Sequence, residues 1–390
     1  MKLRENPPLH LTYCLNIHPG ETWAENLEAI RQYAVEVKQR IAPQQPFGLG
    51  LRIGAAATEA LRLPATRQAL RAELEARGLY AFTINGFPFG RFHDARVKEQ
   101  VYAPDWRTRE RLDYTCRLAD ILADLLPEGA IGSISTLPGS FKPWITTPDD
   151  VQRMTQQLKA CALYLLKLHE KTGREILLGL EPEPFCFLET TDEVIRFFDG
   201  TLRDACDGGA EREIVRRHIG VCFDTCHAAV QFESPVKALQ RIVARGIRVA
   251  KIQLSAALET DTGSLNALRA FDEPVYLHQT KAQRLDGSLL AWPDLPEALP
   301  ALAARSDLGN VRVHFHVPLF WEGGAGLRST AADLDAKFFR AACAATEHLE
   351  VETYTFSVLP EAMRAGGVVK CISRELDWAW QKIGPQMNTD

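Results

Sequence analysis

The chain has 390 residues, of which 46% are hydrophobic and 24% are charged, and its formal net charge is -5 at pH 7. This composition is typical of a globular protein, and no stretch approaches the roughly 18 apolar residues of a membrane span. The amino-terminal segment lacks the apolar centre of a secretory signal. No cluster of lysine and arginine indicates binding to nucleic acid or to an anionic membrane. Nine scattered cysteines contain no CxxC pair, so we expect a reduced, cytoplasmic protein without zinc-ribbon spacing.

Short apolar runs alternate with long amphipathic stretches along the chain. Nine runs are typical of strands: Leu11–Ile17, Phe47–Ile53, Leu79–Asn85, Ile131–Thr136, Ile176–Glu181, Ile219–Asp224, Val249–Leu254, Val311–Val317 and Leu349–Tyr354. Helical patterns fill most of the gaps: Thr22–Ile41, Thr58–Arg77, Trp106–Leu126, Val151–Lys171 and Thr330–His348. Repeated strand–helix alternation predicts parallel strands joined by right-handed crossovers, and eight such units close a barrel. We therefore predict an α/β fold, a (β/α)8 TIM barrel, as a single domain over residues 1–390.

One of the nine candidate strands must lie outside an eight-stranded barrel. The segment 255–318 contains proline and glycine and is irregularly patterned. We expect it to form an insertion after the seventh strand, with Val311–Val317 as an added strand or hairpin arm. The alternative is that Val311–Val317 belongs to the barrel and an earlier run does not. Near the carboxyl terminus, the spacing of Ile372, Leu376 and Trp380 predicts a helix packed on the barrel exterior.

Polar residues recur where the later strands end. Glu181 ends the fifth strand, Asp224 the sixth, Gln253 lies near the end of the seventh, and Glu352 lies in the last. Strand ends of this fold converge on one mouth, and buried carboxylates are costly unless they are paired or bound to a cation. Oxygen ligands suit Mg²⁺, Mn²⁺ or related divalent ions. Each carboxylate taken alone has an equally good structural interpretation, as a helix cap or an ion-pair partner.

The segment Gly220–His227, GVCFDTCH, resembles a motif of endonuclease IV and of the wider xylose isomerase-like barrel superfamily. In that superfamily a Glu, an Asp, a His and a Glu on strands five to eight hold a metal. The resemblance therefore implies a xylose isomerase-like TIM barrel and a site for Mn, Mg, Co or Zn at Glu181, Asp224, Gln253 and Glu352. Gln253 departs from the usual His, so the missing imidazole is expected from His316 or His314.

The whole chain resembles the EboE family of metabolite-traffic proteins, which are similar to sugar phosphate isomerases and epimerases. The phrases that carry this resemblance are CLNIHPGETW, INGFPFGRFH, VYAPDW, STLPGSFK, LEPEPFCFLETT, FDTCHAAV, YLHQ and HFHVPLFW. The resemblance implies a fold and a superfamily, and it leaves the substrate open.

Further polar residues are expected at the same mouth as substrate-binding groups: His18, Asn85, His93, Lys142, Glu183, His227, His278 and His314. His314 and His316 alternate along one run, so they are expected to face the same side. His278 is a loose positional analogue of a metal-binding His of endonuclease IV. Structural alternatives are a turn residue for His18, a packed hydrophobic lid for the loop from Asn85 to His93, and a solvated side chain for Lys142. The aromatic residues in that loop suit a small organic ligand.

Three functions remain open. In the first, a metal at Glu181, Asp224 and Glu352 binds a small hydroxy-carbonyl metabolite, and Glu181 and Glu352 act as the acid/base pair of an isomerase or epimerase working through enediolate chemistry. The second is a non-catalytic metabolite-binding or traffic protein that uses the barrel mouth. The third is a metal-dependent phosphodiesterase of endonuclease IV type, against which the strand ends LRIGAA and TINGFP lack histidine and the chain lacks a basic face. The expected partner is a small molecule, and oligomeric state stays open.

Overall fold

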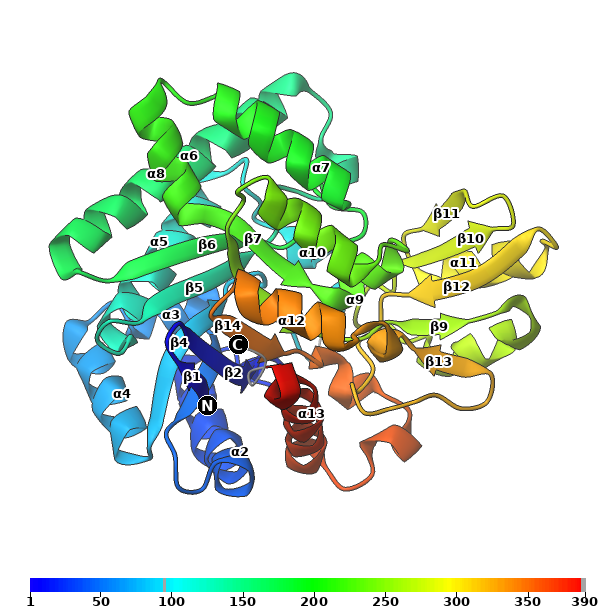
Figure 1. Cartoon of the computed structure of the whole chain (residues 1–390), viewed down its shortest axis with the longest axis horizontal. Helices are drawn as coiled ribbons and strands as arrows, with labels where there is room; N and C mark the ends of the chain where they lie inside the picture. Colours follow the sequence, from blue (N-terminus) through cyan, green and yellow to red (C-terminus); the bar gives the residue numbers. More distant parts are fainter. Residues whose placement is uncertain (94–95, 387–390) are drawn as a thin grey trace.

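The computed structural model describes residues 1–93 and 96–386, and eight parallel strands form its centre (Figure 1). These strands are β2 (Pro8–Tyr13), β3 (Phe47–Arg52), β4 (Leu79–Asn85), β5 (Ile131–Thr136), β6 (Glu175–Leu180), β7 (Ile219–Asp224), β8 (Val249–Leu254) and β14 (His348–Val351). A ninth strand, β1 (Lys2–Glu5), pairs antiparallel with β2. The barrel closes through a parallel bridge between Cys14 and Gly50 and through Thr12 Oγ1, which donates to Gly48 O at 2.6 Å. The predicted (β/α)8 TIM barrel is confirmed.

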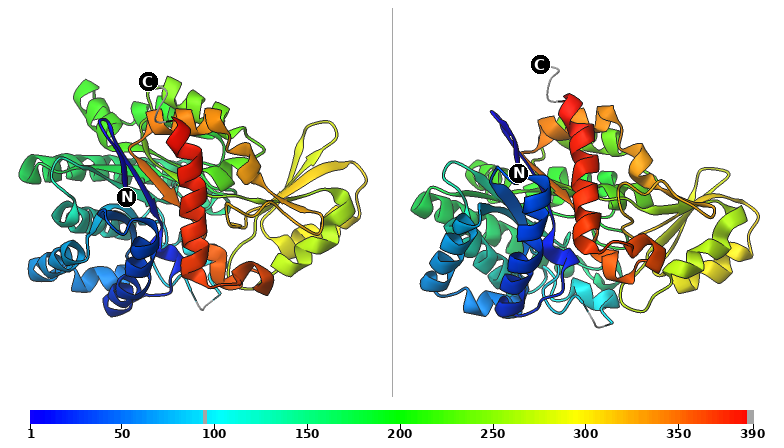
Figure 2. Two further views of the ribbon diagram at one scale, coloured as in Figure 1. Left: turned by 60° about the horizontal axis from the view of Figure 1, so that its bottom comes forward. Right: turned by 90° about the horizontal axis from the view of Figure 1, so that it is seen from below.

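Helices cover the outside of the barrel (Figures 1 and 2). They are α1 (Trp23–Ala29), α2 (Val35–Ile41), α3 (Ala55–Ala60), α4 (Pro64–Ala76), α5 (Arg109–Leu125), α6 (Pro148–Thr172), α7 (Thr191–Arg196), α8 (Gly209–His218), α9 (Thr225–Val230), α10 (Pro235–Ala244), α12 (Ala336–Ala345) and α13 (Val368–Ile383). Capping boxes begin α6 at Thr147 and α7 at Thr190. In each, the threonine side chain accepts a hydrogen bond from the backbone N–H three residues later, and the acidic side chain of that later residue accepts one from the backbone N–H of the threonine. Over residues 1–93 and 96–386, no helix is both long and apolar enough to span a membrane.

Two helical predictions are corrected. The expected helix Thr58–Arg77 is two helices, because Pro64 begins α4 and the preceding Leu63 takes an extended conformation with ψ 122°. On α13, Ile372 and Leu376 are buried as predicted, but Trp380 is 41% exposed. The smaller Ala379 takes the buried position at this turn, and Trp380 lies about 100° further round the helix.

Between β8 and β14 the chain forms a second sheet beside the barrel (Figures 1 and 2). Its order is β11 (Leu289–Trp292), β10 (Thr280–Arg284), β12 (Leu308–Val313), β9 (Leu258–Thr260), β13 (Leu327–Ser329), with α11 (Leu295–Ala303) after β11. All of its pairings are antiparallel. This decides the ambiguity left by the sequence, because the strand that contains Val311 and Val313 pairs with β9 and β10 and lies outside the barrel.

The insertion departs from the expected segment in two respects. The second sheet runs past residue 318, because Leu327–Ser329 pairs with β9 as a further strand. In addition, β12 ends at Val313, so His314 and His316 follow the strand instead of lying on it. The backbone of His314 nevertheless stays attached to the sheet, since its N–H donates to Gln279 O at 2.8 Å.

The barrel interior below the mouth is polar. Lys251 on β8 and Glu350 on β14 form an ion pair in which both side chains are fully buried. Gly50 on β3 makes room for it, since a Cβ there would lie 1.8 Å from Glu350 Oε1. Nearer the opposite end, Ser133 Oγ lies within hydrogen-bond distance of Thr83 Oγ1 and His348 Nδ1, at 2.7 and 2.8 Å. The strands therefore place charge directly under the residues at their carboxyl ends.

Candidate functional site

Three carboxyl groups meet at the carboxyl-terminal rim of the barrel. Glu181 follows β6, Asp224 ends β7 and Glu352 follows β14. One carboxylate oxygen from each lies within 4.8 Å of the other two, and all three side chains are buried. Glu181 Oε2 and Asp224 Oδ2 have no hydrogen-bond partner among the residues that the structure describes. Buried acceptors are normally satisfied, so this donor set of converging oxygens, two of them unpartnered, fits a divalent cation.

The three carboxyl groups of this cluster differ in the direction of their pKa shifts. Burial raises the pKa of Glu181 to about 8, and the nearby charge of Asp224 adds to the effect of burial while His227 opposes it. Burial likewise holds the pKa of Glu352 well above its ordinary value, with Glu181 and Asp224 adding to it. Asp224 behaves oppositely: burial raises its pKa, but His227, His316 and two hydrogen bonds outweigh burial and leave the pKa lowered. A cation among the oxygens would favour the ionised form of all three groups.

Two asparagines orient Glu352. Asn16 Nδ2 and Asn85 Nδ2 each donate to Glu352 Oε1 at 2.8 Å, and Asn85 Oδ1 accepts from Phe87 N. Asn85 was predicted as a substrate-binding residue, and it lines the cavity as well as holding Glu352. Asn16 was missed, although it lies in the 3-10 helix Leu15–Ile17 just after β2, at the same rim where Asn85 ends β4. Neither asparagine donates to the other carboxylate oxygen, Glu352 Oε2.

Gln253 is fully buried near the end of β8, paired in register with Asp224 on one side and Glu350 on the other. Its amide oxygen accepts a hydrogen bond from Cys222 Sγ at 2.9 Å, and its Nε2 has no partner. The oxygen that would bind a metal is therefore engaged by a thiol. Its predicted role as a ligand stays a prediction.

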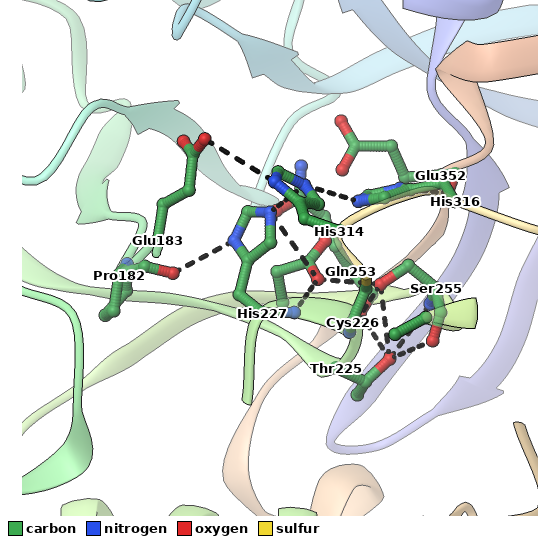
Figure 3. Close-up of polar contacts among 12 residues, drawn as sticks. Pro182, Glu183, Thr225, Cys226, His227, Gln253, Ser255, His314, His316 and Glu352 are labelled. Carbon is green, nitrogen blue, oxygen red and sulfur yellow. Dashed lines mark hydrogen bonds and ion pairs between the residues drawn. The ribbon is translucent and has the colours of Figure 1, made fainter. Parts of the chain in front are cut away.

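Three imidazoles, those of His227, His314 and His316, lie next to one another (Figure 3). The Nδ1 atom of each contacts an acceptor oxygen: Pro182 O at 2.9 Å for His227, Gln279 Oε1 at 2.7 Å for His314, and Glu352 O at 2.9 Å for His316. Each Nδ1 therefore carries the proton, and the Nε2 atoms face each other at 3.1 Å between His227 and His314 and 3.3 Å between His314 and His316. The lone pairs of two facing Nε2 atoms repel each other unless a proton or a cation lies between them.

Burial lowers the pKa of all three histidines, but the outcome differs. For His227 the carboxylates of Asp224, Glu183 and Glu181 outweigh burial and raise its pKa. The pKa of His314 falls well below its ordinary value, and that of His316 falls to about 4. Of the three imidazoles, His227 is the one whose pKa favours the protonated form. With Asp224, His227 and His316 form a second group whose ligand atoms lie within 4.8 Å of one another.

A cavity of about 60 Å³ opens over this cluster. Of the residues predicted for the site, its lining includes Glu181, Glu183, Glu352, Asn85, His227 and His314. Glu183 is held there by Tyr102 OH, which donates to its Oε1 at 2.8 Å. Gln279 Nε2 in turn donates to Tyr102 OH at 2.7 Å. Tyr102 and Gln279 were not predicted, because nothing in the local sequence shows that the loop after β4 and the insertion meet.

The structure places four predicted binding residues away from the cavity. His18 contacts Tyr13 OH at 3.1 Å and stacks on Tyr33, and Lys142 pairs with Glu189 and Glu193. His278 lies 2.7 Å from Glu273 Oε1 and stacks on Phe315. His93 supports the site from behind, with its Nε2 2.6 Å from Asn16 O and its Nδ1 3.0 Å from Tyr276 OH. Lys142 is ion-paired and not simply solvated, His18 contacts two tyrosine side chains, and the predicted ligand-binding roles of both residues stay predictions.

The comparisons with known proteins found similarity of fold only. No family model matches the chain, and no curated protein matches it. A xylose isomerase domain protein from Alicyclobacillus acidocaldarius subsp. acidocaldarius is similar, with 12% identity and a TM-score of 0.49 over 97% of this chain and 99% of that one. The IOLI protein with a bound zinc atom has 11% identity and a TM-score of 0.49 over 98% and 100%. D-psicose 3-epimerase has 11% identity and a TM-score of 0.48 over 96% and 99%. The strands and helices of the chain itself define an α/β barrel, and its rim carries a candidate metal centre.

Proposed function

We propose that this protein is a metal-dependent isomerase or epimerase of the EboE type that acts on a small hydroxy-carbonyl compound. One observation carries the proposal: Glu181, Asp224 and Glu352 converge in a buried site, and two of their carboxylate oxygens have no partner within residues 1–93 and 96–386. A group of this kind is costly to bury without a cation. Glu181, Asp224 and Glu352 would hold the ion, with His316 as the imidazole ligand. Mixed oxygen and imidazole ligands suit Mn, Co or Zn better than Mg.

A bound divalent ion would act as a Lewis acid that polarises a carbonyl group and stabilises negative charge on its oxygen. Glu181 and Glu352 flank Asp224, because β6 and β14 lie on opposite sides of β7 in the order β14-β8-β7-β6. A ligand above Asp224 therefore lies between two carboxyl groups. One of them, as a carboxylate, would remove the proton from the carbon beside the carbonyl, and the other, as a carboxylic acid, would donate its own proton to the opposite face. Asn16 and Asn85 fix the orientation of Glu352 for this role.

The test is metal content by mass spectrometry, on protein purified without chelator or metal-affinity resin. We expect about one Mn, Co, Zn or Mg per chain in the wild type and none in Glu181→Gln/Asp224→Asn. The matched control, Glu36→Gln/Asp113→Asn, makes the same chemical changes at side chains that are 50% and 49% exposed, and it should keep the metal. A wild-type protein that binds no metal, even with excess Mn²⁺ or Zn²⁺, would contradict the proposal.

The second candidate is a metabolite-binding protein without catalysis, of the traffic kind that the EboE resemblance suggests. The observation in its favour is Gln253, whose amide oxygen is already bonded to Cys222 and whose position lacks an imidazole. Proton exchange separates the two functions. In D₂O, an isomerase incorporates deuterium beside the carbonyl of a bound hydroxy-ketone, whereas a carrier binds the compound and leaves its carbon-bound hydrogens unchanged.

A further inference from the structure

The lining of the cavity combines acids with a continuous apolar surface. The acids are Glu181, Glu183 and Glu352. The apolar part consists of Phe92, Val97 and Tyr276, which pack together, with Val101 and Tyr354 against them. These residues come from the loop after β4, from the insertion and from the segment after β14, so three distant parts of the chain build one apolar surface. A ligand whose oxygens reach the carboxylates has the remainder of its surface against these side chains.

Among the described residues that line the cavity, Lys98 is the only lysine or arginine. Its ammonium group is already saturated, because it donates to Asp294 Oδ2 at 2.6 Å, Tyr276 O at 2.7 Å and Glu273 O at 3.4 Å. An ammonium has three donors, so none is left for a ligand. Lys98 therefore holds the loop after β4 to the insertion and does not provide an anion site.

The two amides considered at the amino terminus of α9 are not available to an anion either. Helix α9 begins beside Asp224, and helix amino termini are common phosphate sites. Here the amides are taken: His227 N donates to Asp224 Oδ1 at 2.9 Å, and Cys226 N donates to Ser255 Oγ at 2.9 Å.

The charge balance also disfavours an anionic ligand. Three carboxyl groups, Glu181, Asp224 and Glu352, surround the place of a single divalent cation, and a fourth, Glu183, lines the cavity beside them. The pair Lys251–Glu350 below them is neutral as a whole. Even with the imidazolium of His227 counted as positive, a phosphate dianion would add charge of the sign already present. Phosphate recognition in proteins normally uses arginine, lysine or free backbone amides.

We propose that the substrate is an uncharged hydroxy-carbonyl compound with an apolar tail, and not a sugar phosphate. This inference rests on the proposed function, which it narrows. The hydroxyl and carbonyl oxygens face the carboxylates and the ion. The tail lies against Phe92, Val101 and Tyr354.

The test uses three compounds that share the head HO–CH₂–C(=O)–: 1-hydroxy-2-butanone, dihydroxyacetone and dihydroxyacetone phosphate. Their dissociation constants are measured by calorimetry on the full chain loaded with Mn²⁺. Replacing a hydroxyl by a buried methyl group should make 1-hydroxy-2-butanone bind about three- to tenfold more tightly than dihydroxyacetone. Dihydroxyacetone phosphate should bind at least about tenfold more weakly than dihydroxyacetone, because its dianion meets unpaired carboxylates. Phosphate binding equal to or tighter than that of 1-hydroxy-2-butanone would overturn the inference.

A variant tests the tail directly. Val101→Thr keeps the shape of a wall residue and adds a hydroxyl group, so it should reduce the preference for 1-hydroxy-2-butanone over dihydroxyacetone several-fold. Val243→Thr makes the same change at a side chain that is 46% exposed, and it should leave the preference unchanged. Equal preferences in both variants and the wild type would refute the placement of the tail. A separate Mn²⁺ titration tests metal binding. If Mn²⁺ does not bind, the proposed function fails. The order of affinities of the three compounds for the metal-free protein then still decides the substrate class.

Discussion

Glu375 is a buried carboxyl group outside the cavity, and its replacement should make stability less dependent on pH. It lies on α13, where its Oε1 accepts hydrogen bonds from Thr353 Oγ1 at 2.6 Å and Leu319 N at 3.1 Å. Thr353 directly follows Glu352, and Leu319 lies three residues beyond His316. The side chain therefore connects the carboxyl-terminal helix to both segments that carry site residues.

Burial raises the pKa of Glu375 from 4.5 to about 7. The sign of the effect follows from proton linkage. The folded state binds this proton more tightly than the unfolded state does, so the stabilisation is fully present below pH 4.5 and is lost as the pH rises through 7. At about 1.4 kcal/mol for each pH unit between the two values, the loss amounts to about 3 kcal/mol. Glu375→Gln keeps an acceptor for Thr353 and Leu319 but does not ionise.

We therefore expect Glu375→Gln to raise the free energy of unfolding at pH 8 by up to about 3 kcal/mol, and at pH 5 by less than about 1 kcal/mol. The assay is urea unfolding of both proteins at the two pH values, with the slope of the transition compared to confirm that the unfolded states match. As a control, Glu375→Ala removes the acceptor and should be destabilised at both pH values. Equal stabilities of Glu375→Gln and wild type at pH 8 would refute the reasoning.

Three further predictions concern the barrel interior and its rim. Lys251→Met leaves the charge of Glu350 buried without a partner and should lower the free energy of unfolding in urea by about 3–5 kcal/mol. The double variant Lys251→Met/Glu350→Leu should recover most of this loss. A Lys251→Met variant as stable as wild type would contradict this prediction. Gly50→Ala places a Cβ 1.8 Å from Glu350 Oε1 and should cost about 1–3 kcal/mol, whereas Gly209→Ala, with nothing within 4 Å of the new Cβ, should not lower the thermal midpoint. Lys142→Met should leave metal content and hydroxy-ketone affinity unchanged, because Lys142 does not line the cavity, and a loss of either would restore the ligand-binding role first predicted for it.

Local pattern was sufficient to predict most of the barrel. Eight of the nine apolar runs contain barrel strands, because the periodicity of a strand or a helix is visible within one short stretch of sequence. The same pattern failed where one residue interrupts it, as at Pro64, and where two residues compete for one buried position, as at Ala379 and Trp380. It also left Val311–Val317 undecided. Parallel barrel strands and antiparallel insertion strands have similar apolar composition, and only the partner strand distinguishes them.

The sequence by itself predicted that Glu181, Asp224 and Glu352 meet, since each stands at the carboxyl end of a buried parallel strand and parallel strands end at one rim. Only the tertiary structure decided what surrounds them. Asn16, Tyr102 and Gln279 reach the site from segments far apart in the chain, and the imidazoles of His314 and His316 arrive from an insertion whose path has no local signature. Their hydrogen bonds form only after the barrel and the second sheet have come together, so no window of sequence contains them.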